Sequence, residues 1–132
     1  MEKIILDTNF LMIPGQFKVD IFSEIERICN FNYKICIYEG SIRELENIIK
    51  TSNVKDRMAA TLALKILKSK KLHILEGKNV DVDSLILEST DKDTIIATQD
   101  MKLKRKLLEM GTDIIILRQK KYLELIRRKL YK

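Results

Sequence analysis

The sequence contains few of the residues that build disulfide frameworks and zinc sites. Its 132 residues include two Cys, one His, one Pro, four Gly and no Trp. Cys29 and Cys36 are too few for a disulfide framework and are not spaced as C-x-x-C, so we expect two buried free thiols. His73 is the single histidine and lies in the apolar run Leu72–Leu75, where we expect a strand. Histidine-rich zinc motifs are therefore excluded, and carboxylates remain as the reactive groups.

Long apolar runs are also missing. No run approaches the roughly 20 residues that a transmembrane helix needs. The N-terminal segment reaches Asp7 after only three apolar residues, whereas a secretory signal needs a stretch of about 7–15. The length fits one domain over residues 1–132, and 45% apolar with 33% charged residues is a folded composition. We therefore expect a single cytoplasmic domain with no membrane partner.

Positive charge is concentrated in the last quarter of the chain. The formal net charge is +6, from 25 basic and 19 acidic residues. Residues 1–100 carry 14 basic and 16 acidic residues, whereas residues 101–132 carry 11 and 3. Such a segment suits a polyanionic partner, most often a nucleic acid. A lysine-rich composition that serves solubility is the alternative interpretation.

Short Ile-rich runs alternate with longer amphipathic segments. The short runs predict strands, because unbroken apolar runs are typical of parallel strands covered on both faces. The expected strands are Lys3–Leu6, Lys34–Tyr38, Leu72–Leu75, Thr94–Thr98 and Asp113–Leu117. The expected helices are Val19–Cys29, Ser41–Ile49, Val54–Lys68, Val82–Glu88, Lys102–Met110 and Lys120–Leu130. This alternation predicts an α/β fold with a central parallel sheet between two layers of helices.

Four acidic residues lie where a functional site of such a sheet is expected. Ligands bind beyond the carboxyl ends of parallel strands, near the point where the strand order reverses. Asp7 and Asp100 follow the first and fourth expected strands, and Glu44 and Asp83 lie in the first turns of the helices after the second and third. Four carboxylates at one edge repel one another unless a cation lies among them. Without His or Cys ligands, that cation is expected to be Mg²⁺ or Mn²⁺.

Each acid also has a purely structural interpretation. Ser41-x-x-Glu44 fits a capping box, in which the glutamate only satisfies backbone N–H groups at a helix start. Asp83 and Asp100 fit helix N-caps, and Asp7 fits a cap for the turn after its strand. The convergence of all four on one sheet edge is what favours a site.

The same residues resemble those of the PIN domain (PilT N-terminus) family of small metal-dependent ribonucleases. The matching segments are Ile5-Leu6-Asp7-Thr8-Asn9, Glu44-Leu45, Asp83-Ser84-Leu85-Ile86 and Ile96-Ala97-Thr98-Gln99-Asp100, followed by Leu103. Two stretches, Asp7–Pro14 and Leu117–Lys121, resemble archaeal PIN proteins related to ribosomal-RNA processing factors. The resemblance spans essentially the whole chain.

The resemblance implies a three-layer α/β/α sandwich that hydrolyses RNA phosphodiester bonds with one or two Mg²⁺ or Mn²⁺ ions. Carried over by position, the metal-site acids are Asp7, Glu44, Asp83 and Asp100, and Asn9 and Thr98 orient them. Many relatives have a second Asp after the third acid, where this chain has Ser84, so Asp81 is the alternative to Asp83. Implied partners are RNA, a second copy of the chain as a homodimer, and an antitoxin protein, because toxins of toxin–antitoxin pairs share the fold.

The expected chemistry is a two-metal hydrolysis. One ion lowers the pKa of a water, and a second, about 3.5–4 Å away, stabilises the leaving oxygen. The basic C-terminal residues are expected to hold the RNA backbone without reading bases. They are Lys120, Lys121, Arg127, Arg128 and Lys129.

Two other functions remain open from the sequence. A PIN-fold protein that binds RNA as an inactive scaffold in ribosome biogenesis would usually lack some of the acids, and all four are present. A receiver or phosphotransferase domain also places acids at strand ends. Nucleophilic phosphotransferases usually carry D-x-D after the first strand, where this chain has Asp7-Thr8-Asn9.

Overall fold

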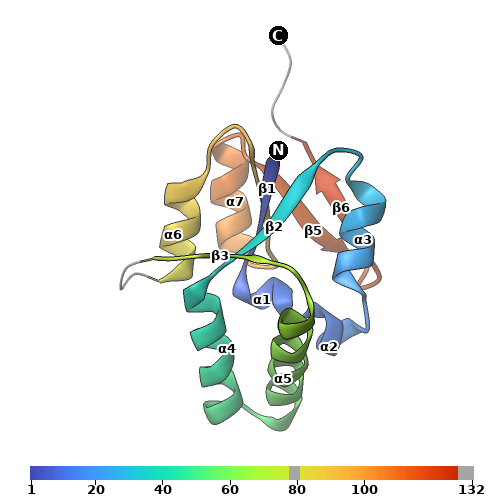
Figure 1. The fold of residues 1–132 in the computed structure, drawn as a ribbon, viewed down its shortest axis with the longest axis vertical. Coiled ribbons are helices and arrows are strands. Elements are labelled where there is room, and N and C mark those ends of the chain that lie inside the picture. Colours follow the sequence, from blue (N-terminus) through green and yellow to red (C-terminus); the bar gives the residue numbers. More distant parts are fainter. Residues whose placement is uncertain (78–80, 128–132) are drawn as a thin grey trace.

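The computed structural model describes residues 1–77 and 81–127, and a six-stranded sheet forms its centre (Figure 1). The strand order is β3-β2-β1-β4-β5-β6. The first five strands are parallel, as the sequence predicts, and β6 is antiparallel to β5. The bounds are β1 Glu2–Leu6, β2 Tyr33–Tyr38, β3 His73–Leu75, β4 Thr94–Ala97, β5 Asp113–Arg118 and β6 Tyr122–Ile126.

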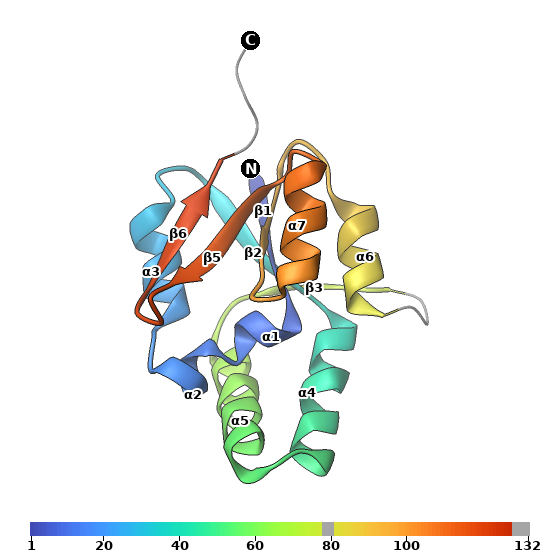
Figure 2. The ribbon, with the colours of Figure 1, turned by 180° about the vertical axis from the view of Figure 1, so that it is seen from behind.

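Helices cover both faces of the sheet, which confirms the three-layer α/β prediction. The helices are α1 Thr8–Leu11, α2 Ile13–Phe17, α3 Ile21–Ile28, α4 Glu39–Thr51, α5 Val54–Ser69, α6 Val82–Ser89 and α7 Met101–Glu109. On β1, Ile4 and Leu6 pack into the core shared with α1 to α5, whereas Ile5 packs into the core shared with α6 and α7. Figures 1 and 2 both show α3 on one side of the strands and α6 with α7 on the other.

Side chains at the helix starts explain where several helices begin. Asp20, Asn53 and Asp81 each accept a hydrogen bond from the backbone N–H three residues later, at 3.1, 2.9 and 2.8 Å respectively. These N-caps satisfy donors that have no partner within the helix. The short helices α1 and α2 are not predicted from the sequence, because four or five residues show no helical periodicity.

The predicted helix over Lys120–Leu130 is wrong in its described part, residues 120–127. Gln119 and Lys120 have positive φ angles of 52° and 58°, and they turn the chain back so that β6 pairs with β5. Along β6 the side chains alternate, with Leu123 buried and Glu124 exposed. Leu123 and Ile126 are spaced as in a helix, but they lie on a strand that covers the edge of the sheet.

The strand order reverses at β1, which has β2 on one side and β4 on the other. Leu6 is in register with Ala97, and the Asp7 N–H donates to the Ala97 carbonyl oxygen at 2.9 Å. Asp7 and the residues after β4 therefore lie side by side at the carboxyl edge of the sheet. Among the helices of the described ranges, none is long and apolar enough to cross a bilayer.

Both cysteines are buried and free, as predicted. Burial raises the pKa of both thiols, and that of Cys29 reaches about 11. The thiols therefore stay protonated at neutral pH and act as small apolar side chains. His73 lies in β3, also as predicted.

Candidate active site

Four carboxylates line one hollow at the point where the strand order reverses. The hollow has a volume of about 220 Å³. Its lining residues are Asp7, Thr8, Asn9, Met12, Glu44, Ile48, Asp83 and Asp100. Every acid predicted from the sequence is thus brought to the same place by four different elements. The helices that border the hollow are α1, α4, α6 and α7, which lie beside one another in Figure 2.

Asp7 is the most deeply buried of the four, with an exposed fraction of 3%. Its Oδ1 accepts from the Thr8 N–H at 2.9 Å, which caps α1, and its Oδ2 accepts from the Thr98 hydroxyl at 2.7 Å. Burial raises the pKa of Asp7 from 3.8 to about 6, with smaller contributions from the charges of Asp83 and Glu44. The hydrogen bonds act in the opposite direction and do not compensate for burial.

Asp100 caps a helix and also lines the hollow. Its Oδ1 accepts from the backbone N–H groups of Lys102 and Leu103 at 2.9 and 3.1 Å, so it is the N-cap of α7. It also lines the hollow. The Thr98 hydroxyl accepts from the Asp100 N–H at 3.0 Å while it donates to Asp7. One threonine therefore links the two acids.

Glu44 is not part of a capping box. Helix α4 begins at Glu39, two residues before Ser41, and Tyr38 is its N-cap residue. The Ser41 hydroxyl is buried and accepts from the Thr8 hydroxyl at 2.8 Å. The capping interpretation of Glu44 is therefore wrong, and the Ser41 bond instead ties α4 to α1.

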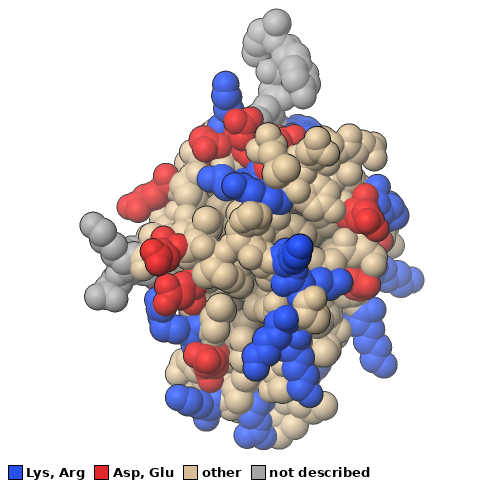
Figure 3. Space-filling view, viewed as in Figure 1, with Lys and Arg blue, Asp and Glu red and all other residues tan. Residues whose placement is uncertain are grey.

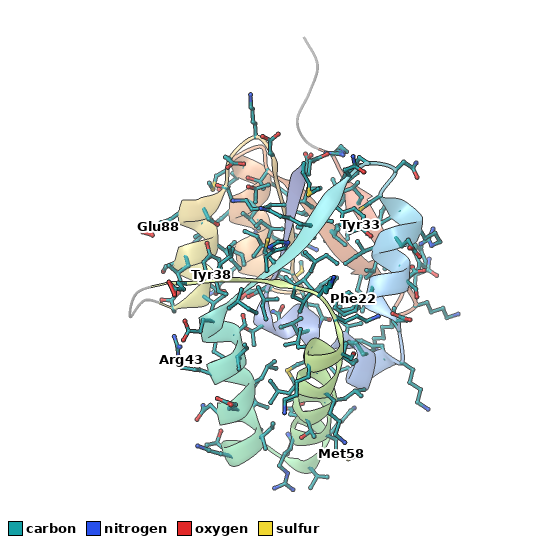
Figure 4. All side chains as sticks on the ribbon, in the orientation of Figure 1. Phe22, Tyr33, Tyr38, Arg43, Met58 and Glu88 are labelled. Atoms are coloured by element: carbon teal, nitrogen blue, oxygen red, sulfur yellow. The ribbon has the colours of Figure 1, made fainter. Side chains whose placement is uncertain are left out.

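Asp83 rather than Asp81 reaches the hollow. Asp81 is the exposed N-cap of α6, and its hydrogen bonds with Ser84 lower its pKa. The N-cap interpretation of Asp83 is therefore wrong. The pKa of Asp83 is raised by partial burial and by the charges of Asp100, Asp81 and Glu44. Tyr38, at the end of β2, lies beside α6 and donates to the Leu85 carbonyl oxygen at 3.4 Å (Figure 4).

Asn9 holds the connection between β4 and α7. Its Oδ1 accepts from the Gln99 N–H at 3.1 Å and lies 3.5 Å from the Thr98 hydroxyl oxygen. The Gln99 side chain in turn donates to the Asn9 carbonyl oxygen at 2.8 Å and to Gln16 Oε1 at 3.2 Å. Gln99 has no predicted role from the sequence, although it lies between Thr98 and Asp100. Asn9 and Gln99 therefore tie the segment after Asp7 to the segment before Asp100.

Comparison with known proteins identifies the family of this chain. The family model described as "PIN like domain" matches residues 4–120. The chain belongs to the PIN domain family. It is 35% identical over 127 residues to Ribonuclease VapC4 of Methanocaldococcus jannaschii, covering 95% of this chain and 97% of that protein. It is 29% identical over 118 residues to Ribonuclease VapC9 of Archaeoglobus fulgidus, covering 89% and 84%.

A solved structure of the PIN domain endonuclease Utp24 has the same fold as this PIN domain. The TM-score is 0.77 at 25% sequence identity, and the alignment covers 95% of this chain and 91% of that one. The resemblance inferred from the sequence motifs is thus confirmed. Family membership also sets aside the receiver or phosphotransferase interpretation.

The donors of this PIN domain fit a hard divalent cation in their chemistry. All four acids present carboxylate oxygens, and no ion pair among the described residues includes any of them. Arg43, beside Glu44 in sequence, pairs with Glu39 at 3.0 Å instead. Within residues 1–77 and 81–127, no three His, Cys, Asp or Glu side chains are close enough to hold one ion as they stand. Glu44 is partly exposed and Asp83 is exposed, so the hollow is open to solvent on their side.

The predicted RNA-binding residues differ in their surroundings. Arg127 donates to Glu2 at 2.9 Å and to the buried Asp113 at 2.7 Å, and its guanidinium lies over the Phe31 ring. Lys120 and Lys121 are exposed in the turn between β5 and β6. Arg128 and Lys129 lie outside the described residues.

A second basic surface is not predicted from the sequence. Lys and Arg side chains gather over α5 and the segment after it, whereas Asp and Glu side chains lie along the side of α4 and α6 (Figure 3). The basic residues of this segment are Lys55, Arg57, Lys65, Lys68, Lys70 and Lys71. The net charge of residues 1–100 does not reveal these basic residues, because acidic residues elsewhere in the same range balance their charge.

Proposed function

We propose that this PIN domain is a ribonuclease that hydrolyses RNA phosphodiester bonds with Mg²⁺ or Mn²⁺ held by Asp7, Glu44, Asp83 and Asp100. The observation that carries the proposal is the convergence of these carboxylates on one hollow, without a paired cation among the described residues. The similarity to two proteins named as ribonucleases and to one named as an endonuclease supports it.

The residues of the chain position and tune the acids. Thr98 and the Thr8 N–H hold both oxygens of Asp7, and the α7 backbone holds one oxygen of Asp100. When bound, divalent ions supply a deprotonated water as nucleophile and stabilise the leaving oxygen, as in two-metal sites. Met12 and Ile48 form an apolar wall of the hollow, which strengthens electrostatic interactions inside it.

A side-chain base is not needed. The single histidine, His73, lies in β3, and β2 separates β3 from β1. Asp7 itself is a poor base once it holds a cation, because the cation favours its charged form and lowers its proton affinity. The four carboxylates therefore act as ligands in this proposal.

The test is cleavage of labelled single-stranded and hairpin RNA by the purified protein with Mn²⁺, with Mg²⁺ and with EDTA. We expect cleavage with one or both ions and none with EDTA. The Glu44→Gln variant, purified in parallel, controls for contaminating nucleases and should lose the activity. RNA that binds but stays intact under every metal condition would contradict the proposal and support the inactive RNA-binding alternative.

A further inference from the structure

A second hollow lies beside the carboxylate site, on the other side of the β4–α7 connection. It has a volume of about 380 Å³, within the roughly 300–1,000 Å³ range of small-molecule sites. We call it the Phe17 hollow. The residues that matter for its chemistry are Phe17, Thr98, Gln99, Lys104, Ile116 and Lys120.

The two hollows share their wall. Thr98 lines the Phe17 hollow and donates its hydroxyl hydrogen to Asp7 at 2.7 Å. Gln99 lines it too and is hydrogen-bonded to Asn9, which lines the carboxylate site. A linear polymer bound at the carboxylates can therefore place its neighbouring residue in the Phe17 hollow.

The lining combines an aromatic floor with positive charge. Phe17 and Ile116 supply apolar surface, and the Lys120 ammonium lies 6.0 Å from the centre of the Phe17 ring. Lys104, on the first turns of α7, is the second cation. No described Asp or Glu lines the hollow, so nothing in its lining repels a phosphate. An aromatic face with two ammonium groups matches a nucleotide, because bases stack on aromatic rings and phosphates pair with lysines.

We propose that the Phe17 hollow binds one nucleotide of the RNA next to the bond that is cut, with the base against Phe17 and the phosphate between Lys104 and Lys120. The proposal rests on the proposed ribonuclease function and adds a binding site to it. It assigns Lys120 a local role, in place of the diffuse backbone contact expected from the basic C-terminal segment.

The test measures binding separately from cleavage. The affinity for a short fluorescent single-stranded RNA is measured by anisotropy in EDTA over a range of salt concentrations. Phe17→Leu removes the ring but keeps an apolar side chain and should weaken binding roughly tenfold, whereas Phe17→Tyr keeps the ring and should bind like the unmodified protein. The Lys104→Gln/Lys120→Gln variant should also bind roughly tenfold more weakly and flatten the slope of log K against log salt.

Two controls separate this site from general effects. Lys34→Gln/Lys50→Gln removes the same charge at the amino end of β2 and the last turn of α4, outside both basic surfaces, and should change affinity by less than about twofold. Melting curves verify that each variant is folded. RNA that lacks the base next to the cleavage site should bind the unmodified protein as weakly as normal RNA binds Phe17→Leu. Abasic RNA and Phe17→Leu together should lower the affinity no further than either change alone.

The outcomes distinguish the two proposals. If the protein cleaves RNA but Phe17→Leu and Lys104→Gln/Lys120→Gln bind it normally, the nucleotide site is wrong and the ribonuclease proposal stands. In that case a side chain of a protein partner, and not a nucleotide, is the candidate occupant of the hollow. If the unmodified protein neither binds nor cleaves RNA, both proposals fail.

Discussion

Replacing Asp7 by Asn tests most directly whether the buried carboxylate serves a cation or only caps α1. The change is nearly isosteric. Asn Oδ1 can accept from the Thr8 N–H as Asp does, and its amide group can donate to the Thr98 hydroxyl, which has two acceptor lone pairs. The substitution therefore removes the charge and keeps the local hydrogen bonds.

The magnitude follows from the raised pKa. A shift of the Asp7 pKa from 3.8 to about 6 corresponds to about 3 kcal/mol, at 1.36 kcal/mol per pH unit. Because the folded state binds this proton more tightly than the unfolded state, the stabilisation is fully present below pH 3.8 and lost as the pH rises through about 6. At pH 8 the metal-free protein therefore carries the full cost of the buried charge.

We expect Asp7→Asn to melt higher than the unmodified protein at pH 8 in EDTA. Allowing about 1 kcal/mol for imperfect hydrogen bonds, the gain is about 2 kcal/mol, or roughly 6–8 °C for a chain of this length. Near pH 4, where folded Asp7 is already protonated, the gain should disappear and the hydrogen-bond penalty should leave the variant slightly less stable, by up to about 1 kcal/mol. The variant should also lose RNA cleavage and most of the thermal stabilisation by Mn²⁺, since only ligands that bind the native state raise the midpoint.

The assays are melting curves at both pH values, with EDTA and with Mn²⁺, together with one cleavage reaction. A plain capping role makes the opposite prediction, because loss of a cap costs about 1 kcal/mol at either pH and leaves cleavage intact. A variant that melts early at pH 8 and still cuts RNA would refute both the pKa argument and the metal-site assignment.

Three further changes test other parts of the site. Glu44→Gln should reduce cleavage at least about 100-fold and change stability by less than about 0.5 kcal/mol, as a melting curve verifies; unchanged cleavage would remove Glu44 from the site. Thr98→Val should lower cleavage roughly 10–100-fold and raise the Asp7 pKa further, visible in a pH–rate profile, whereas Thr98→Ser should restore both. Arg127→Gln should lower the free energy of unfolding in urea by about 1–3 kcal/mol, because Arg127 pairs with Glu2 and Asp113. For the same reason it should leave the salt dependence of RNA binding unchanged. A flatter slope of log K against log salt would show that Arg127 contacts RNA.

The sequence by itself determined the parallel part of the fold and the identity of the four acids. Strands buried on both faces must be continuously apolar. Runs such as Ile4–Leu6 and Ile95–Ala97 can therefore be recognised as strands from the sequence. Asp7 and Asp100 follow such runs directly, and parallel strands bring their carboxyl ends to one edge. The position of these acids is therefore a local property of the chain, apparent before any tertiary contact is known.

Only the tertiary structure decided the features that depend on distant partners. Leu123 and Ile126 suit a helix or a strand, and pairing with β5 selects the strand. Ser41 suits a capping box until its hydroxyl is found bonded to Thr8, 33 residues away. The Thr98 hydroxyl reaches Asp7 across 91 residues, and this contact links the acids. Local patterns specify which backbone a segment prefers, but a single hydroxyl or carboxylate has several competing partners, and packing of the whole chain chooses among them.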